Sequence, residues 1–524
     1  MIWRAFDRPL KRRKCAALAA ALFLFGGAVS ADTEITLTSV GGGLSVSGPL
    51  IGYDGEYIEI ASRYGPLTLT YASVECAGTD CPERDGFVPR FSMSGEAAVI
   101  DVLIPALWEG FARSKGWATK FDPVEDGQIS VAMSPDGDTA AVLELTSGTT
   151  TKGFADLFAH RSWSVAATRE VTPEELSMAS RQGMRDLQSS ERSRIIGLDA
   201  ITPIVSPLRK TRTLSLMQLQ RALKGEVSDW ADFGEAPGPV ELHLGPTDAG
   251  TTETVLRFLA EGDVAPSVTF HDTEQALTNA VVRNRNAIGL VSFQRTGGAR
   301  AVGLRDDCGF LTAPTALGIK TEDYPLTTPV FLYVPQRIMP AVFKEFLIWT
   351  RSPAAQLIVR RAGFVDQSVL PIGLEAQGQR FANAIERAGT EVSFDELQRF
   401  VRLINDQTRL SLSFRFEAGS VNLDAQSRSN LSDLASAIRQ GRYAGKTLTL
   451  IGFSDGIGDA AANRALSGER AEAVRQSILR RLGDDLPPSV TLEVAAFGEA
   501  LPMACDDTEI GQRTNRRVEL WVED

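Results

Sequence analysis

GFSDGIGDAAANRALSGERAEAVRQSIL, residues 452–479, is the stretch that decides the fold of the C-terminal part of the chain. The apolar run that ends at Phe453 predicts a strand. Apolar residues then recur at helical spacing, which predicts a helix over Ser467–Leu482 that buries Ala471, Val474, Ile478 and Leu482. Further strands are predicted for LSLSFRF (410–416), VTLEVAAFG (490–498) and RRVELWV (516–522), and a second helix for Ser427–Arg439. Residues 411–524 are therefore expected to form a compact α/β domain.

An acid and a base stand at the two sides of the predicted strand-to-helix connection. Ser467 is expected to cap the helix and to place Arg470 in its first turn, where free amides and the helix dipole favour an anion. Asp455 follows the strand and is expected to face the same cleft. Such a pair matches a zwitterionic amino acid. The alternative is an internal salt bridge between Asp455 and Arg470 that binds no ligand.

This region resembles the OmpA-like peptidoglycan-binding domain over about the last 110 residues. The resemblance rests on four ordered elements, which are Gly452–Asp455, Asn463, Leu466-Ser467-x-x-Arg470-Ala471 and Asn515–Glu519. It implies that Asp455 takes the ammonium and Arg470 the carboxylate of the diaminopimelate in a peptidoglycan stem peptide, with Asn463 in support. Asn515 and Arg516 are expected to hold the fold. Phe453 stands where many members have a histidine.

The middle of the chain, about residues 90–370, alternates predicted strands with predicted helices. ISVAM (129–133) and AIGLVSF (287–293) are examples of the strands, and residues 99–116 are an example of the helices. This alternation predicts an α/β fold with a largely parallel sheet, and its length predicts two lobes. The expected order is a signal peptide (1–31), a small β module (32–85), the two-lobed region (86–372), a helical linker (373–410) with a capping box at Ser393 and Glu396, and the C-terminal domain.

The middle region resembles periplasmic binding proteins of the phosphate-binding type. The matches include SGTTTKGFADL (147–157), DAGTTETVLRFL (248–259) and KTEDYPLTTPVFLYV (320–334). The resemblance implies two lobes that close on an oxyanion held by backbone amides, hydroxyl groups and a few charges. The candidate anion-binding residues that it implies are Ser147, Gly148, Thr149, Thr150, Thr168, Arg169, Gly250 and Thr251.

Two loops of this implied site depart from the family pattern. Gly95-Glu96-Ala97-Ala98 replaces a Gly-Ser-x-Thr loop, and Gly245 stands in place of an arginine. Each lost hydrogen bond to a charged group forfeits ~1.5–3 kcal/mol. The sequence therefore leaves three hypotheses open: the region binds phosphate, binds another small solute, or has been repurposed to bind a protein.

The first 31 residues have the pattern of a secretory signal peptide. Six basic residues and one acidic residue precede Cys15, the apolar run Ala16–Gly27 follows, and Ala31 ends a short stretch suited to cleavage. An uncleaved N-terminal anchor is the alternative. Cleavage changes the net charge from −12 to −17, and neither value favours a nucleic-acid partner. We expect a periplasmic protein associated with peptidoglycan and the outer membrane.

Four cysteines follow the predicted cleavage site, and an oxidising compartment favours disulfides among them. Cys76 and Cys81 enclose a tight polar turn and are the expected pair, while Cys308 and Cys505 remain by elimination. A zinc site is the alternative, but His160, His243 and His271 show no ligand spacing relative to the cysteines. We expect no metal and no cofactor.

These features favour a non-enzymatic protein that is anchored to peptidoglycan and binds a small anion such as phosphate, or another solute, for uptake or sensing. The alternative is a structural protein that links peptidoglycan to an outer-membrane or periplasmic protein partner, with its solute site degenerate. An enzyme is disfavoured, because the chain lacks a Gly-x-Ser-x-Gly elbow and a Ser–Lys penicillin-binding signature.

Overall fold

The computed structural model of this chain describes residues 34–83, 86–125, 127–247, 249–262, 264–387, 392–416, 420 and 422–523. The predicted signal peptide, residues 1–31, lies outside the described residues. Within these ranges, no helix combines the length and the apolar character needed to span a membrane.

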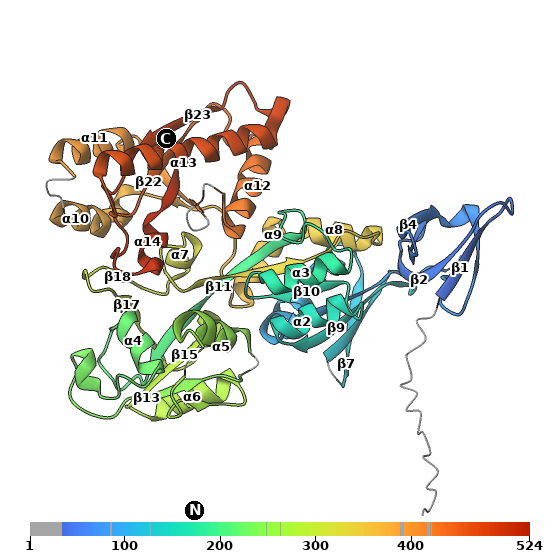
Figure 1. The fold of residues 1–524 in the computed structure, drawn as a ribbon, viewed down its shortest axis with the longest axis horizontal. Coiled ribbons are helices and arrows are strands. Elements are labelled where there is room, and N and C mark those ends of the chain that lie inside the picture. Colours follow the sequence, from blue (N-terminus) through green and yellow to red (C-terminus); the bar gives the residue numbers. More distant parts are fainter. Residues whose placement is uncertain are drawn as a thin grey trace, which may run out of the picture.

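A small antiparallel sheet begins the described chain. Its order is β4-β3-β2-β1-β5, and alternate residues such as Ile35, Leu37, Ile58 and Ile60 point into its core. The disulfide Cys76–Cys81 closes the turn after β5. The sheet lies at one end of the molecule, far from the C-terminal domain (Figure 1). Its strands are β1 (Glu34–Ser39), β2 (Ser45–Tyr53), β3 (Tyr57–Ser62), β4 (Gly65–Thr70) and β5 (Val74–Ala77).

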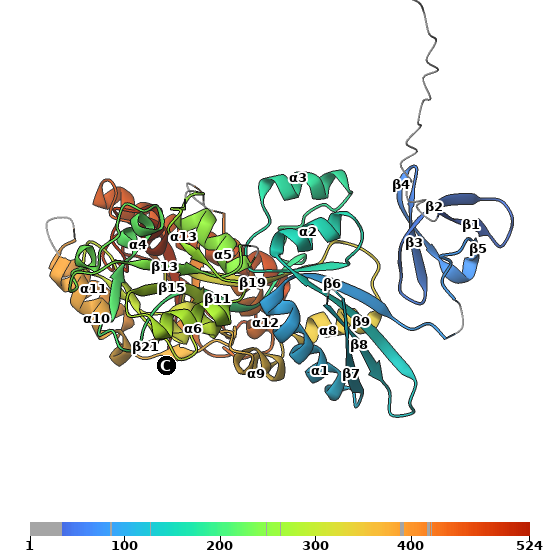
Figure 2. The ribbon, with the colours of Figure 1, turned by 90° about the horizontal axis from the view of Figure 1, so that it is seen from below.

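The middle region is built on one long sheet with the order β14-β13-β15-β11-β19-β10-β6-β9-β8-β7. The first lobe holds β6–β10, the second lobe holds β13–β16, and β11 and β19 run between them (Figures 1 and 2). The sheet is mixed, which differs from the expected largely parallel sheet: β6, β9 and β10 pair in parallel, but β11 pairs antiparallel with both β15 and β19. The reason is that RIIGL and ITPIV form one continuous strand, β11, instead of two strands joined by a crossover.

Helices cover both faces of this sheet. The first-lobe core gathers around Trp108 and Phe343, and the second-lobe core includes Trp230 and Leu244. The strands of the two lobes are β6 (Arg90–Glu96), β7 (Ala118–Val124), β8 (Gly127–Met133), β9 (Thr139–Gly148), β10 (Ser164–Ala167), β11 (Ser193–Val205), β12 (Thr213–Ser215), β13 (Glu241–Leu244), β14 (Thr269–Phe270), β15 (Ala287–Ser292), β16 (Arg300–Ala301), β17 (Gly303–Arg305), β18 (Leu311–Thr312) and β19 (Thr327–Tyr333). The helices are α1 (Ile104–Ser114), α2 (Thr150–Phe158), α3 (Pro173–Arg181), α4 (Leu216–Leu223), α5 (Gly250–Thr254), α6 (Glu274–Arg283), α7 (Ala316–Lys320), α8 (Ala341–Trp349) and α9 (Pro353–Arg361).

The C-terminal domain has a five-stranded sheet with the order β20-β21-β24-β22-β23. The predicted stripe of Ala471, Val474, Ile478 and Leu482 is buried against this sheet. The segment expected to be a helical linker forms α10 and α11, and Phe400 of α11 packs with Phe453 and Trp521 of the sheet. The elements are β20 (Pro371–Ile372), α10 (Gly378–Arg387), α11 (Phe394–Ile404), β21 (Gln407–Arg415), α12 (Ala425–Arg439), β22 (Thr447–Phe453), α13 (Ala460–Leu482), β23 (Thr491–Ala496), α14 (Glu509–Asn515) and β24 (Arg517–Glu523).

The C-terminal domain rests on both lobes of the middle region (Figure 1). On the first lobe, Arg351 forms an ion pair with Asp433 at 3.6 Å. On the second lobe, Arg409 of β21 pairs with Asp323 at 3.1 Å, and the disulfide Cys308–Cys505 links the two parts covalently. The two lobes and the C-terminal domain therefore form one connected body.

A buried carboxylate, Glu519 of β24, holds three arginines at the base of this domain. Glu519 is fully buried and pairs with Arg380, with Arg517 Nε at 2.8 Å and with Arg409 Nε at 3.4 Å. Burial alone would raise the pKa of Glu519, but the three guanidinium groups outweigh it and hold the pKa far below its usual range. Since Arg409 also pairs with Asp323, this cluster continues into the second lobe.

Candidate functional site

The helix that carries Arg470 begins earlier than the sequence predicts. Asp459 caps α13, and its side chain accepts a hydrogen bond from the N–H of Ala462 at 2.9 Å. The expectation that Ser467 caps the helix is therefore wrong, and Arg470 lies about three turns along α13. The helix packs closely against β22 at Ser467. A Cβ atom on Gly452 would lie 2.0 Å from the carbonyl oxygen of Ser467, so only glycine fits at this point of β22. An anion near Arg470 must therefore be bound by the guanidinium itself and not by the helix terminus.

Asp455 lies in the loop after β22 and is paired with Arg516. Arg516 Nη1 donates to Asp455 Oδ2 at 3.0 Å, and the N–H of Ile457 donates to Asp455 Oδ1 at 3.3 Å. The side chains of Asp455 and Arg516 are 14% and 15% exposed, so the pair is mostly covered by protein and keeps a small exposed part. Sequence reasoning assigned Arg516 to the fold alone. The position of Arg516 within the Asn515–Glu519 motif was the sequence feature that could have indicated its contact with Asp455.

Arg470 is buried, and no described residue forms an ion pair with it. Among the residues that the structure describes, its Nε and Nη1 atoms have no hydrogen-bond partner, and its guanidinium lies 5.5 Å from the ring centre of Phe416. Burial lowers the pKa of Arg470, Arg516 lowers it further, and Asp455 opposes both effects. A buried guanidinium with free donors is costly unless an anion satisfies it. The expected alternative of an internal Asp455–Arg470 salt bridge is not formed, because Asp455 pairs with Arg516.

Further polar groups surround the same loop. Asn463 of α13 is buried, and its Nδ2 donates to Glu499 Oε2 at 3.3 Å. A methyl group on Gly456 would lie 2.9 Å from Asp506 Oδ2 and 3.3 Å from Glu499 Oε2, so these two carboxylates border the loop. Phe453, in the place of the family histidine, is buried and packs with Phe497. Acidic groups and the two arginines, Arg470 and Arg516, therefore lie close to the same loop.

In the middle region, a carboxyl group lies between the two lobes where the resemblance implies an anion. Glu96, at the end of β6, accepts a hydrogen bond from the N–H of Gly250 in the second lobe, with an N–Oε2 distance of 2.8 Å. Burial raises the pKa of Glu96 to about 8, with the Gly250 hydrogen bond opposing and Glu274 adding to the rise. A methyl group on Gly250 would lie 2.2 Å from Glu96 Oε2, so the carboxyl group fills this space.

Arg169, the expected positive charge of the anion site, is engaged by carboxylates. It donates to Glu175 through Nη1 and Nη2, both at 2.9 Å, and to Glu253 of the second lobe through Nε at 2.8 Å. Its Nη2 also donates to Thr151 Oγ1 at 2.9 Å. Neutralised in this way, Arg169 offers no free charge to a ligand.

The remaining predicted anion-site residues make internal contacts. Ser147 donates to Asp101 at 3.0 Å, and Thr149 caps α2 by accepting from the N–H of Lys152 at 2.9 Å. The N–H of Thr168 donates to Thr150 Oγ1 at 3.2 Å, whereas Thr168 Oγ1 is buried with no hydrogen-bond partner among the described residues. Gly148 ends β9, and Gly250 and Thr251 begin α5. The loops that carry Thr150, Thr168 and Gly250 lie near one another, and Glu96, Glu253 and Glu274 lie among them.

The titration of Glu96 supplies a test of this arrangement. The folded pKa of about 8 lies above the value near 4.3 of an unfolded glutamate, so the stability that the protonated carboxyl contributes is fully present below about pH 4.3 and is lost as pH rises through 8. We compare the free energies of unfolding of Glu96→Gln and the wild type as the pH is raised from 4.5 to 9. Over this range we expect the wild type to lose roughly 2–5 kcal/mol relative to the variant. Chemical unfolding across this pH range measures the difference. Parallel curves for the two proteins would contradict the prediction, and Glu109→Gln on the exposed face of α1 is the control.

Comparison with known proteins identifies two parts of the chain. Residues 415–516 match the model of the OmpA family, and residues 124–353 match the model of a PBP superfamily domain. The protein therefore combines a two-lobed periplasmic-binding-protein fold with a C-terminal OmpA domain, preceded by a small β sheet.

Among curated proteins, Outer membrane porin F of Pseudomonas fluorescens is 32% identical over 115 residues, which are 22% of this chain and 33% of that protein. The chain spans about a third of the length of the two porin F proteins that it matches. Phosphate-binding protein PstS of Staphylococcus haemolyticus is 25% identical over 251 residues, which are 46% of this chain and 77% of that protein.

Among solved structures, an ABC-type phosphate transport receptor from Vibrio cholerae has a TM-score of 0.41 and 16% identity, and the match covers 52% of this chain and 99% of that chain. A putative phosphate ABC transporter substrate-binding protein from Clostridium perfringens has a TM-score of 0.41 and 18% identity, covering 53% of this chain and 99% of that one.

Proposed function

We propose that this protein is a non-enzymatic envelope protein that binds peptidoglycan through Asp455 and Arg470 of its OmpA domain. The single observation that carries the proposal is the buried guanidinium of Arg470, whose Nε and Nη1 atoms have no hydrogen-bond partner within the described part of the chain. A carboxylate ligand supplies the missing acceptor and the missing negative charge at once. That the two matched families are families of binding proteins supports the absence of catalysis.

The ligand class that fits is an amino acid that carries both charges at one end. We assign the carboxylate of a diaminopimelate side chain to Arg470 and its ammonium to Asp455. Asn463 supports the loop through Glu499, and the carboxylates of Glu499 and Asp506 add negative potential near the ammonium. This assignment follows the family resemblance and accounts for the groups of opposite charge that lie near the loop.

For the two-lobed region we propose a structural role, in which it presents the peptidoglycan-bound domain to a protein of the outer membrane or periplasm. The observation that favours this role over solute uptake is the Glu96 carboxyl group against the N–H of Gly250. An anion would have to displace this group and face Glu253 and Glu274 as well, while Arg169 is already neutralised. A periplasmic location, reached through the predicted signal peptide, is part of the same proposal.

Cosedimentation with purified sacculi tests the peptidoglycan proposal. We expect the full chain to sediment with sacculi whose stem peptides contain diaminopimelate and to be released by free diaminopimelate. Sacculi with lysine in that position lack the second carboxylate and are expected to bind weakly. Equal binding to both kinds of sacculi would overturn the assignment of Arg470.

Calorimetry with inorganic phosphate tests the role of the lobes. Loss of several charge-assisted hydrogen bonds, at ~1.5–3 kcal/mol each, moves a micromolar site beyond the millimolar range. We therefore expect no binding heat near pH 7.5 when the phosphate concentration is about 1 mM, which would still detect a site with a dissociation constant of about that value. A saturable heat with a micromolar dissociation constant would restore the phosphate-receptor hypothesis.

A further inference from the structure

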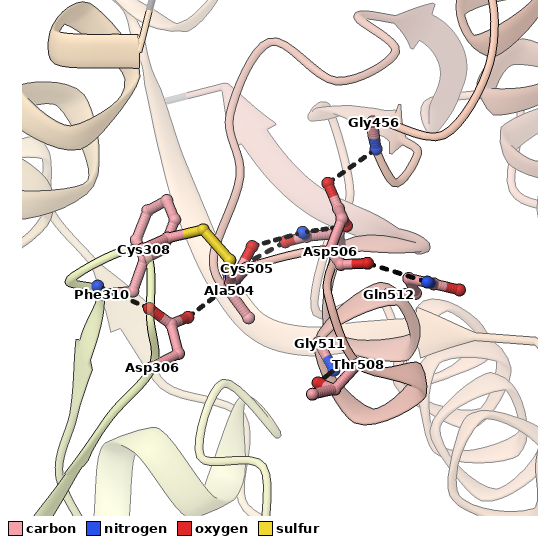
Figure 3. The surroundings of a disulfide bond; sticks show 11 residues. Asp306, Cys308, Phe310, Gly456, Ala504, Cys505, Asp506, Thr508, Gly511 and Gln512 are labelled. Atoms are coloured by element: carbon pink, nitrogen blue, oxygen red, sulfur yellow. Dashed lines mark hydrogen bonds between the residues drawn. A yellow bond between two sulfur atoms is a disulfide. The ribbon is translucent and has the colours of Figure 1, made fainter. Parts of the chain in front are cut away.

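The loop between β23 and α14 joins the second lobe to the candidate ligand site. Cys505 in this loop forms the disulfide with Cys308, which follows β17. The N–H of Cys505 also donates to Asp306 Oδ2 at 2.6 Å (Figure 3). Asp306 in turn accepts from the N–H of Phe310 at 2.9 Å, which fixes its position in the hairpin of β17 and β18. One covalent bond and one charge-assisted hydrogen bond therefore hold this loop to the second lobe.

Asp506, the next residue, touches both halves of the ligand site. Its Oδ2 accepts from the N–H of Gly456 at 2.8 Å, directly after Asp455 (Figure 3). Its Oδ1 accepts from Asn515 Nδ2 at 2.8 Å, directly before Arg516. Asp455 and Arg516 are themselves paired at 3.0 Å, so a single carboxylate holds the backbone N–H that follows Asp455 and the side-chain amide of the residue that precedes Arg516.

A third contact closes this network. The backbone carbonyl of Asp506 accepts from Gln512 Nε2 at 2.9 Å, and Gln512 Oε1 accepts from Arg516 Nη1 at 3.4 Å. Asp506 also has little freedom to move toward the loop, because Gly456 approaches it so closely that even a methyl group would lie 2.9 Å from its Oδ2. Cys505 is therefore linked to Asp455 through the side chain of Asp506 and the N–H of Gly456.

We infer that the second lobe of the binding-protein fold sets the position of Asp455 for its ligand, through the Cys308–Cys505 disulfide and the carboxylate of Asp506. Asp506 is a positioning residue, and the lobe is a structural part of the peptidoglycan site. This inference rests on the proposed function, since it concerns the affinity of that same site.

The test compares full-length variants in the sacculus-binding assay. Asp506→Ala removes both hydrogen bonds and is expected to weaken binding at least tenfold, while Asp506→Asn keeps one acceptor oxygen and is expected to lose less. The Cys308→Ser/Cys505→Ser double variant is expected to weaken binding about threefold to tenfold. Cys76→Ser/Cys81→Ser removes the other disulfide, far from the site, and is expected to bind like the wild type.

Hydrogen exchange at the Gly456 amide separates positioning from general destabilisation. We expect this amide to exchange faster in Asp506→Ala and in the Cys308/Cys505 variant, while the amides of α13 keep their protection. Wild-type binding and Gly456 protection in both variants would overturn the inference and leave the proposed function intact. Failure of the wild type itself to bind sacculi would instead overturn the proposed function.

Discussion

Replacing Arg470 by alanine is expected to weaken peptidoglycan binding about 100-fold without lowering the thermal stability of the protein. The guanidinium offers two donor atoms, Nε and Nη1, for which the described residues supply no acceptor, so a bound carboxylate would gain two charge-assisted hydrogen bonds. At ~1.5–3 kcal/mol each, their loss corresponds to a factor of 100 or more in the dissociation constant. Stability is expected to hold or to rise, because the substitution removes a buried charge that no described residue neutralises.

This combination distinguishes a ligand-binding arginine from a structural one. A structural arginine would cost stability when it is removed, and it would leave binding intact as long as the protein folds. Asp455→Ala is expected to lose binding to a similar extent, but also to lose stability, because it leaves Arg516 without its partner. Arg475→Ala is the matched control, since Arg475 lies on the same helix and pairs with Glu472 on the surface.

Cosedimentation gives the dissociation constants, and calorimetric melting of the same samples gives the stability. Arg470→Lys adds a graded case, because an ammonium is a point charge without the bidentate geometry of a guanidinium. It is expected to recover part of the affinity. Wild-type binding by both Arg470→Ala and Asp455→Ala would remove these residues from the site.

Replacing Glu519 by glutamine is expected to destabilise the protein by about 3–5 kcal/mol. Glutamine has nearly the same shape but leaves Arg380, Arg409 and Arg517 buried without their shared negative charge. The loss is expected to extend to the contact with the second lobe, because Arg409 also holds Asp323. Chemical unfolding at pH 7 measures the effect, and Glu493→Gln on the exposed side of β23 is the control.

The pH dependence of this difference has a defined sign. The pKa of Glu519 is held well below that of an unfolded glutamate, so the stability it contributes is present above about pH 4.3 and is lost as pH falls toward its folded pKa. The difference between wild type and Glu519→Gln should therefore shrink in acid. A difference below about 1 kcal/mol at pH 7 would show that the arginine cluster is stabilised by other means.

Much of the C-terminal domain could be predicted from the sequence, because its signals are local. The buried stripe of Ala471, Val474, Ile478 and Leu482 follows from helical spacing, and the strands follow from short apolar runs. The start of α13 could not be predicted in this way. Ser467 and Asp459 are both good capping residues, and the structure begins the helix at Asp459 and packs Ser467, inside it, against Gly452 of β22.

The candidate site shows the same division. The sequence alone predicted that Asp455 and Arg470 face one cleft, and it placed Glu96 in the loop that the resemblance assigns to an anion. Only the tertiary structure decided that Asp455 pairs with Arg516, that Arg470 is left with free donors, and that Glu96 reaches Gly250 of the other lobe. Hydrogen bonds and ion pairs between distant segments depend on distances of a few ångströms, which sequence periodicity does not encode. For the same reason, the bridge from the second lobe through Cys505 to Asp506 became visible only in the folded chain.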